Sequence, residues 1–109
     1  MGYVNPLWLQ VDAHAKDLFD EGVYAEVEPI VDAELYRVCA DRGIVIPVDG
    51  NGYVSSEYLQ TVVTPLAIWK LLSSVVGVRD DDMQVYQNKA GTYQQEYYMA
   101  LANLCYSKV

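Results

Sequence analysis

The 109-residue sequence predicts a single all-α domain, in which about four helices form a small bundle with one short β-hairpin-like excursion near residues 44–54. Three observations support this fold class. Apolar residues recur three or four positions apart in four separate segments, which is the spacing of one helix face. Asp, Gly and Asn gather at residues 49–52, where a tight turn is expected. No repeat, low-complexity tract or linker interrupts the chain, so we expect residues 1–109 to form one domain.

The first helix is predicted over residues 6–21. Asn5 before Pro6 suits a helix start, because an Asn side chain accepts a hydrogen bond from a free backbone N–H and proline loses nothing at the first helical position. Gly22 is the expected stop. One helix face, which we expect to be buried, carries Leu7, Val11, Ala15 and Leu18.

The second helix is predicted to open at Pro29 and to end at Gly43, since glycine favours the left-handed position just past a helix. Its predicted buried face consists of Val31, Leu35, Val38 and Cys39. After it, the turn signal at residues 49–52 lies between two short extended pieces, residues 44–47 and 53–54. This pattern predicts a hairpin, which needs support from the helices because a lone two-stranded unit is only marginally stable.

The third helix follows Ser55 and Ser56, both good capping residues. Its predicted buried stripe consists of Leu59, Val62, Val63, Leu66, Trp69, Leu72 and Val76. Pro65 interrupts this stripe, so the helix is expected either to be kinked there or to be split, with Thr64 capping a second piece. Gly77 is the expected stop.

The fourth helix has the longest regular pattern, over residues 83–106 without a proline. Asp80, Asp81 and Asp82 precede it and would complement the positive end of its dipole. Its predicted buried face consists of Tyr86, Ala90, Tyr93, Tyr97, Ala100, Leu101 and Leu104.

The charge balance excludes several classes of function. Fifteen acidic residues against seven basic ones give a net charge of -8, which argues against independent binding to nucleic acid or to an anionic membrane. No apolar run is long enough to span a bilayer, and the N-terminus lacks the pattern of a secretory signal, so we expect synthesis in the cytoplasm. In that compartment Cys39 and Cys105 are expected to be free thiols.

The sequence matches no known metal-binding or catalytic motif. Two segments, which begin at Asp49 and Asp80, resemble the start of a calcium-binding loop, but both lack Gly at position six and Glu at position twelve. A single histidine, His14, and two distant cysteines offer no zinc motif, and no nucleophile elbow or phosphate-binding loop is present. We therefore predict no catalytic residue, no cofactor and no metal, and a structural role for His14.

Ten tyrosines are the most unusual part of the composition. Those on the stripe of the fourth helix are expected to pack the core. A second interpretation is that Tyr58, Tyr98 or Tyr106, which lie off the main stripes, contact another subunit. The acidic excess has three open interpretations: a solvated surface, a mimic of nucleic-acid charge, or the lining of a passage for DNA.

Residues 86–97, which read YQNKAGTYQQEY, carry a resemblance to a known family. This run resembles the last helix of head-tail connector (adaptor) proteins in the necks of tailed bacteriophages, where a Tyr, a Lys-Ala pair and further aromatic residues occur at such spacing. The excursion after Gly43 and the helix after Ser56 suit the same plan, so the resemblance covers about residues 28–106.

The resemblance implies a structural virion protein that forms a homo-oligomeric ring, typically twelve-fold in such connectors, beneath the portal and joins the DNA-filled head to the tail. Its partners would be the portal protein and tail or neck proteins, with DNA passing through the channel without specific binding and with no membrane involved. Local complementarity between the acidic subunits would then rely on a few basic residues: Arg37, Arg42, Lys70, Arg79 and Lys89.

Two alternatives stay open. One is an acidic inhibitory binding protein, such as an immunity or anti-defence protein, that occupies a basic surface of a target. The other is an enzyme, which would need a pocket with convergent polar groups.

Overall fold

The computed structural model describes residues 2–75, 83–105, 107 and 109, and the part described is all-α, as the sequence predicts. It contains a short 3₁₀ helix and four α-helices, and no strand is found among the described residues. The elements are η1 (Pro6–Val11), α1 (Ala13–Asp20), α2 (Tyr24–Asp41), α3 (Glu57–Ser73) and α4 (Met83–Ala102).

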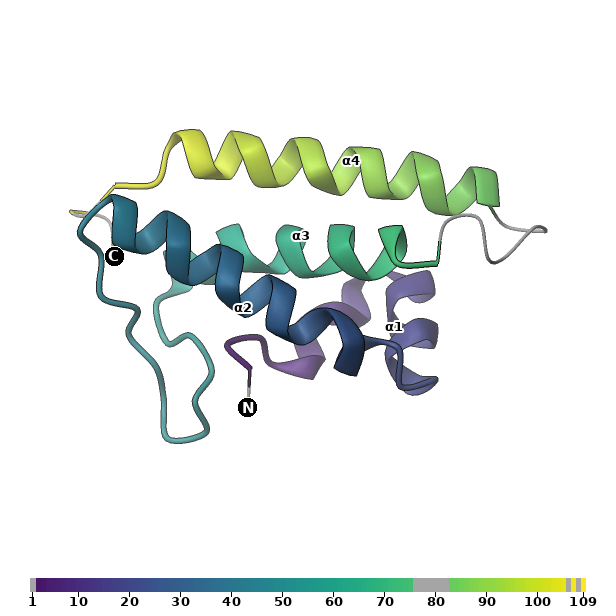
Figure 1. Cartoon of the computed structure of the whole chain (residues 1–109), viewed down its shortest axis with the longest axis horizontal. Coiled ribbons are helices and arrows are strands. Elements are labelled where there is room, and N and C mark those ends of the chain that lie inside the picture. Colours follow the sequence, from purple (N-terminus) through teal and green to yellow (C-terminus); the bar gives the residue numbers. More distant parts are fainter. Residues whose placement is uncertain (1, 76–82, 106, 108) are drawn as a thin grey trace.

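Helix α3 forms the centre of the molecule. It packs against α4 along one side, against α2 along another, and against η1 and α1 near one end (Figure 1). This position follows from composition, because Glu57 and Lys70 are the only charged residues in its 17 positions. Its fully buried side chains are Leu59, Val62, Val63, Leu66, Ala67, Ile68, Leu71 and Leu72. Helix α4, by contrast, lies at the edge of the molecule with one side facing outward.

The prediction of one helix over residues 6–21 is wrong, because Asp12 divides it. Asp12 is extended, at φ -119° and ψ 124°, and its side chain accepts hydrogen bonds from the backbone N–H groups of His14 and Ala15. An aspartate that caps a new helix in this way stabilises a break. The 3₁₀ turn before it has three residues per turn, so Leu9 is buried while Leu7 and Val11 are exposed, contrary to expectation. Asn5 does cap the first turn, as predicted.

The second helix begins at Tyr24, five residues before the predicted start at Pro29. Only Glu21, Gly22, with φ 83°, and Val23 separate it from the end of α1 at Asp20. Pro29 lies inside the second turn of α2, where its missing N–H removes one backbone hydrogen bond. The predicted buried face is confirmed, and Gly43 adopts the left-handed conformation, at φ 69°, just past the helix.

The predicted hairpin near residues 44–54 does not form. Val48 and Val54 make one isolated antiparallel bridge instead of a ladder. Asp49 organises the turn, since its Oδ1 accepts hydrogen bonds from the backbone N–H groups of Asn51 and Tyr53. The carbonyl of Tyr3 accepts a hydrogen bond from the Val54 N–H, so the N-terminal segment also holds this loop.

The other two helices follow the prediction more closely. Pro65 lies inside α3 and does not divide it. Helix α4 ends at Ala102, four residues before the predicted end near 106. Val76, the expected stop at Gly77 and the acidic run at residues 80–82 lie outside the described residues.

Candidate functional site

A buried carboxylate joins the start of α1 to the middle of α4. Asp12 is only 6% exposed. Its Oδ1 accepts the two capping hydrogen bonds, from His14 and Ala15, each at 3.0 Å. Its Oδ2 accepts a hydrogen bond of 3.2 Å from the Tyr93 hydroxyl and lies 3.1 Å from Lys89 Nζ. Burial alone would raise the pKa of Asp12, but the hydrogen bonds from Ala15 and Lys89 outweigh it, so the pKa is lowered and the carboxylate is held in its charged form.

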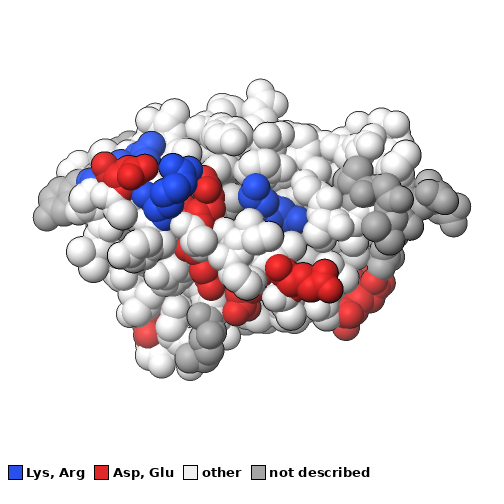
Figure 2. Space-filling view, viewed as in Figure 1, with Lys and Arg blue, Asp and Glu red and all other residues white. Residues whose placement is uncertain are grey.

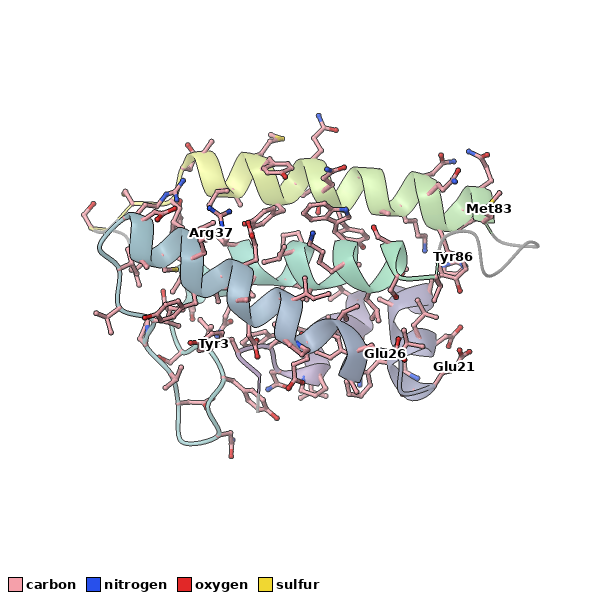
Figure 3. All side chains as sticks on the ribbon, in the orientation of Figure 1. Tyr3, Glu21, Glu26, Arg37, Met83 and Tyr86 are labelled. Atoms are coloured by element: carbon pink, nitrogen blue, oxygen red, sulfur yellow. The ribbon has the colours of Figure 1, made fainter. Side chains whose placement is uncertain are left out.

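His14 completes this cluster. Lys89 Nζ lies 2.7 Å from His14 Nδ1. An ammonium group can only donate, so Nδ1 accepts this hydrogen bond and the ring proton is assigned to Nε2. The imidazole also meets the edge of Tyr86, which points from α4 toward α1 (Figure 3), with ring centroids 5.2 Å apart. This arrangement fixes α1 against α4 and suits the structural role expected of His14.

A second polar link joins α4 to α2. Tyr97 is fully buried and its hydroxyl donates to Glu34 Oε1 at 3.2 Å, while Arg37 Nη2 lies 2.7 Å from the same oxygen. The hydrogen bond from Arg37 is the main cause that lowers the pKa of Glu34. Burial, followed by the charge of Glu34, raises the pKa of Tyr97. Two tyrosines of the α4 stripe, Tyr93 and Tyr97, thus pack against the core and donate their hydroxyl hydrogen bonds to carboxylates.

Each basic residue in the described part of the chain contacts a group of its own chain. Besides Arg37 and Lys89, Lys16 pairs with Asp20 at 3.1 Å. Arg42 donates to the carbonyl of Val38, the last turn of α2. The Lys70 ammonium lies 3.9 Å from the centre of the Trp69 ring. The intersubunit role predicted for these cations therefore competes with contacts inside the subunit, and Arg79 lies outside the described residues.

The outward side of α4 is the first of two uncharged surfaces. We define the outer face of α4 as one arc of exposed residues: Gln84, Gln87, Asn88, Gly91, Gln95, Tyr98, Met99 and Ala102. None of them is charged, although the chain as a whole carries a net charge of -8. In Figure 2 most Asp and Glu atoms lie over α2 and α1, and the upper edge, where α4 runs, is largely white. Tyr98 and Met99 are 51% and 62% exposed.

The second uncharged surface lies where the C-terminal end of α2 meets the following loop and the N-terminal segment. We define this end surface by Tyr3, Tyr36, Ala40, Ile44, Val45, Ile46 and Pro47. Two adjoining cavities of about 440 and 520 Å³ share Ile44 and Val45 in their linings. Val45 is 89% exposed and Tyr36 is 64% exposed. Large apolar side chains exposed together on a small protein indicate a binding surface.

A groove of about 560 Å³ lies between η1, α3 and α4. Its apolar lining includes Trp8, Val11 and Pro65, and the carboxylates of Glu57 and Glu96 stand beside them. The two carboxylates distinguish this groove from the two uncharged surfaces.

The tyrosines and cysteines singled out in the sequence have different environments. Tyr58 donates a hydrogen bond to the carbonyl of Asn103, so it serves the fold. Tyr98 is exposed on the outer face of α4, and Tyr106 lies outside the described residues. Cys39 is buried, which raises the pKa of its thiol, and Cys39 and Cys105 form no disulfide with each other.

Sequence reasoning missed both uncharged surfaces. A signal for the first was present, because residues 83–102 hold only two charges in a strongly acidic chain. The second brings Tyr3, near the N-terminus, beside residues 36–47.

Within residues 2–75, 83–105, 107 and 109, no group of three or more His, Cys, Asp and Glu side chains could hold a metal ion. No helix in this part of the chain is long and apolar enough to cross a membrane. No protein-family model, curated protein or solved structure matches the sequence or the fold.

Proposed function

We propose that this chain is a structural subunit of a bacteriophage neck, a head-tail connector that forms a ring beneath the portal and joins the head to the tail. The observation that carries the proposal is that one small acidic domain exposes two separate uncharged surfaces, the outer face of α4 and the end surface. Two such surfaces on one subunit suit a protein that contacts more than one neighbour.

A ring requires two different contact surfaces on each subunit. Each subunit in a ring with cyclic symmetry meets one neighbour through one surface and the other neighbour through a different surface. The centres of protein interfaces are poor in charged residues and rich in Tyr and Met, which is the composition found around Tyr98 and Met99.

The resemblance of residues 86–97 to the last helix of connector proteins supports the same function. The acidic residues over α1 and α2 also suit a channel wall, because negative charge keeps a passing DNA backbone from binding. In this role the helices act mechanically and bind no cofactor.

The mass of the assembled protein tests the proposal. We expect multi-angle light scattering to show high-order assemblies of the purified chain, either alone or after addition of a phage portal protein. Monomers under both conditions would contradict the function.

A second candidate, the acidic inhibitory protein, is favoured by one observation. Exposed carboxylates at Asp17, Asp20 and Glu26 lie on the α1 and α2 side of the molecule, where Lys16 is the one described cation near them in the sequence. Such a protein would bind a basic target as a 1:1 complex. A genome neighbour that encodes a nuclease or toxin, and a stable complex with it, would favour this function over the connector.

A further inference from the structure

We propose that the groove between η1, α3 and α4 binds an arginine side chain that is carried by an apolar segment of a partner protein. The groove uses none of the residues that define the outer face of α4 or the end surface, so this contact does not depend on self-assembly.

The groove has room for a short segment of chain. Its floor follows α3 from Glu57 to Pro65, which is a length of about 12 Å along a helix axis. Trp8 and Val11 of η1 form one wall, and Glu96 of α4 forms the other. Its volume of about 560 Å³ is more than one side chain needs, so an arginine fits together with an apolar neighbour.

Two unpaired carboxylates determine the charge of the ligand. Glu57 lies at the start of α3 and Glu96 lies on α4, and both side chains are exposed. No basic residue in the part of the chain that the structure describes forms an ion pair with either carboxylate. A cation in the groove is therefore attracted by two carboxylates without breaking a contact inside the subunit, whereas an anion would be repelled.

The hydrogen-bonding groups along the floor favour a ligand that donates. Gln60 Nε2 donates to the carbonyl of Val54 at 3.1 Å. The Thr61 hydroxyl donates to the carbonyl of Tyr58 at 2.6 Å. Pro65 has no N–H, so the carbonyl of Thr61 lacks the donor that another residue would supply at this position of a helix. The floor therefore offers mainly acceptors.

Arginine suits these features best among the basic side chains. Its guanidinium group presents five N–H donors in a flat fork, which matches carboxylate and carbonyl acceptors and packs against an aromatic side chain such as Trp8. Its stem is apolar and suits Val11 and Pro65. A neutral apolar segment would instead cover Glu57 and Glu96 without compensating their charge, which is unfavourable.

Two peptides test whether the charge is required. The probe is a fluorescently labelled pentapeptide with a central arginine between leucine and alanine residues. The control peptide carries citrulline, which has nearly the same shape as arginine but no charge. We expect fluorescence anisotropy at about 150 mM salt to show that the arginine peptide binds roughly tenfold more tightly than the citrulline peptide. Equal binding of the two peptides, or binding of neither, would overturn the inference.

Matched double variants locate the contact. Glu57→Gln combined with Glu96→Gln removes both carboxylates of the groove. Asp17→Asn combined with Glu26→Gln removes the same number of charges from α1 and α2. All four side chains are exposed, so both variants should fold, as circular dichroism would verify. The groove variant should bind the arginine peptide roughly tenfold more weakly, and the control variant should bind it like the wild type. An equal loss in the two variants would indicate general attraction to an acidic chain and would refute the groove as the site.

Light scattering on the same variants identifies the occupant. The groove variant should self-assemble like the wild type, because the groove is assigned to a different protein. A groove variant that no longer assembles would show that an arginine of a second copy fills the groove, and the proposed partner would be wrong. Failure of the peptide to bind would leave the connector function standing, since that function is tested by the mass of the assembly.

Discussion

At the scale of single residues, the buried carboxylate of Asp12 has two separable roles. It caps α1 through two backbone N–H groups, and it holds a negative charge beside Lys89 and Tyr93. Asparagine can still cap a helix but carries no charge, so one substitution separates the roles.

We expect Asp12→Asn to lower the free energy of unfolding by about 1–3 kcal/mol at neutral pH, because the charged hydrogen bonds to Lys89 and Tyr93 are weakened while the cap is kept. Urea denaturation of both proteins measures this loss. Asp20→Asn, which removes an exposed pair with Lys16, is the control and should change stability by less than about 0.5 kcal/mol.

The same variant predicts a pH dependence. The folded protein holds the pKa of Asp12 below its ordinary value of 3.8, so the charge stabilises the fold fully above that value. The stabilisation is lost as the pH falls through the lowered pKa of the folded state. The difference in stability between wild type and Asp12→Asn should therefore shrink in acid below pH ~4. A difference that stays constant down to pH ~2 would refute the assignment.

Tyr97 predicts the opposite dependence, in alkali. Its pKa is raised above the ordinary value of 10.0, so the neutral hydroxyl stabilises the fold below that pH and the stabilisation is lost as the pH rises toward the raised value. Tyr97→Phe should cost about 1 kcal/mol at neutral pH and should lose less stability than the wild type above pH ~10. Denaturation at the two pH values measures this, with exposed Tyr98→Phe as the control.

At the scale of the helices, Gly91 weakens α4 without a reason inside the subunit. Gly91→Ala should raise the free energy of unfolding by about 0.5–1 kcal/mol, because alanine favours the helix and space for its Cβ is open. Urea denaturation of both proteins measures this gain, and a variant no more stable than the wild type would contradict the prediction.

The helices also show which parts of the fold can be predicted from the local sequence. The buried faces of α2 and α3 follow the apolar periodicity, since both helices pack one stripe against a common core. Periodicity failed over residues 6–21 because Leu7 and Val11 continue the helical spacing across Asp12, and spacing takes no account of a capping side chain. The start of α2 was predicted wrongly for a different reason. Proline is common at the first position of a helix, but Pro29 lies inside α2.

Tertiary contacts explain the remaining differences. The turn at Asp49 was predicted from its residues, but the flanking segments pair with each other only around the Val48–Val54 bridge, and Val54 also bonds to Tyr3. The end surface was beyond prediction for the same reason, because Tyr3, Tyr36 and Ile44 come together only in the folded chain. The outer face of α4 could have been predicted without the structure, because the lack of charged residues along this helix is visible in the sequence.

At the scale of the whole molecule, charge is distributed unevenly. Residues 83–102 carry only Lys89 and Glu96, although the net charge of the chain is -8, so two copies repel at long range and yet meet without charge repulsion at the uncharged surfaces. The two proposed functions use this distribution in opposite ways, because a connector must overcome the repulsion between copies, whereas an inhibitor exploits attraction to a basic target.

The salt dependence of association should therefore distinguish a connector from an inhibitor. Raising the salt concentration from about 50 mM to about 500 mM shortens the screening length to a few ångströms, which removes the repulsion between acidic copies and leaves the apolar contact intact. We expect self-assembly to become stronger over this range, as measured by light scattering at fixed protein concentration. The complex of an acidic inhibitor with a basic target would become weaker under the same change. Assembly that dissolves in salt would show that the copies are joined through charged groups, and hence through surfaces other than the outer face of α4 and the end surface.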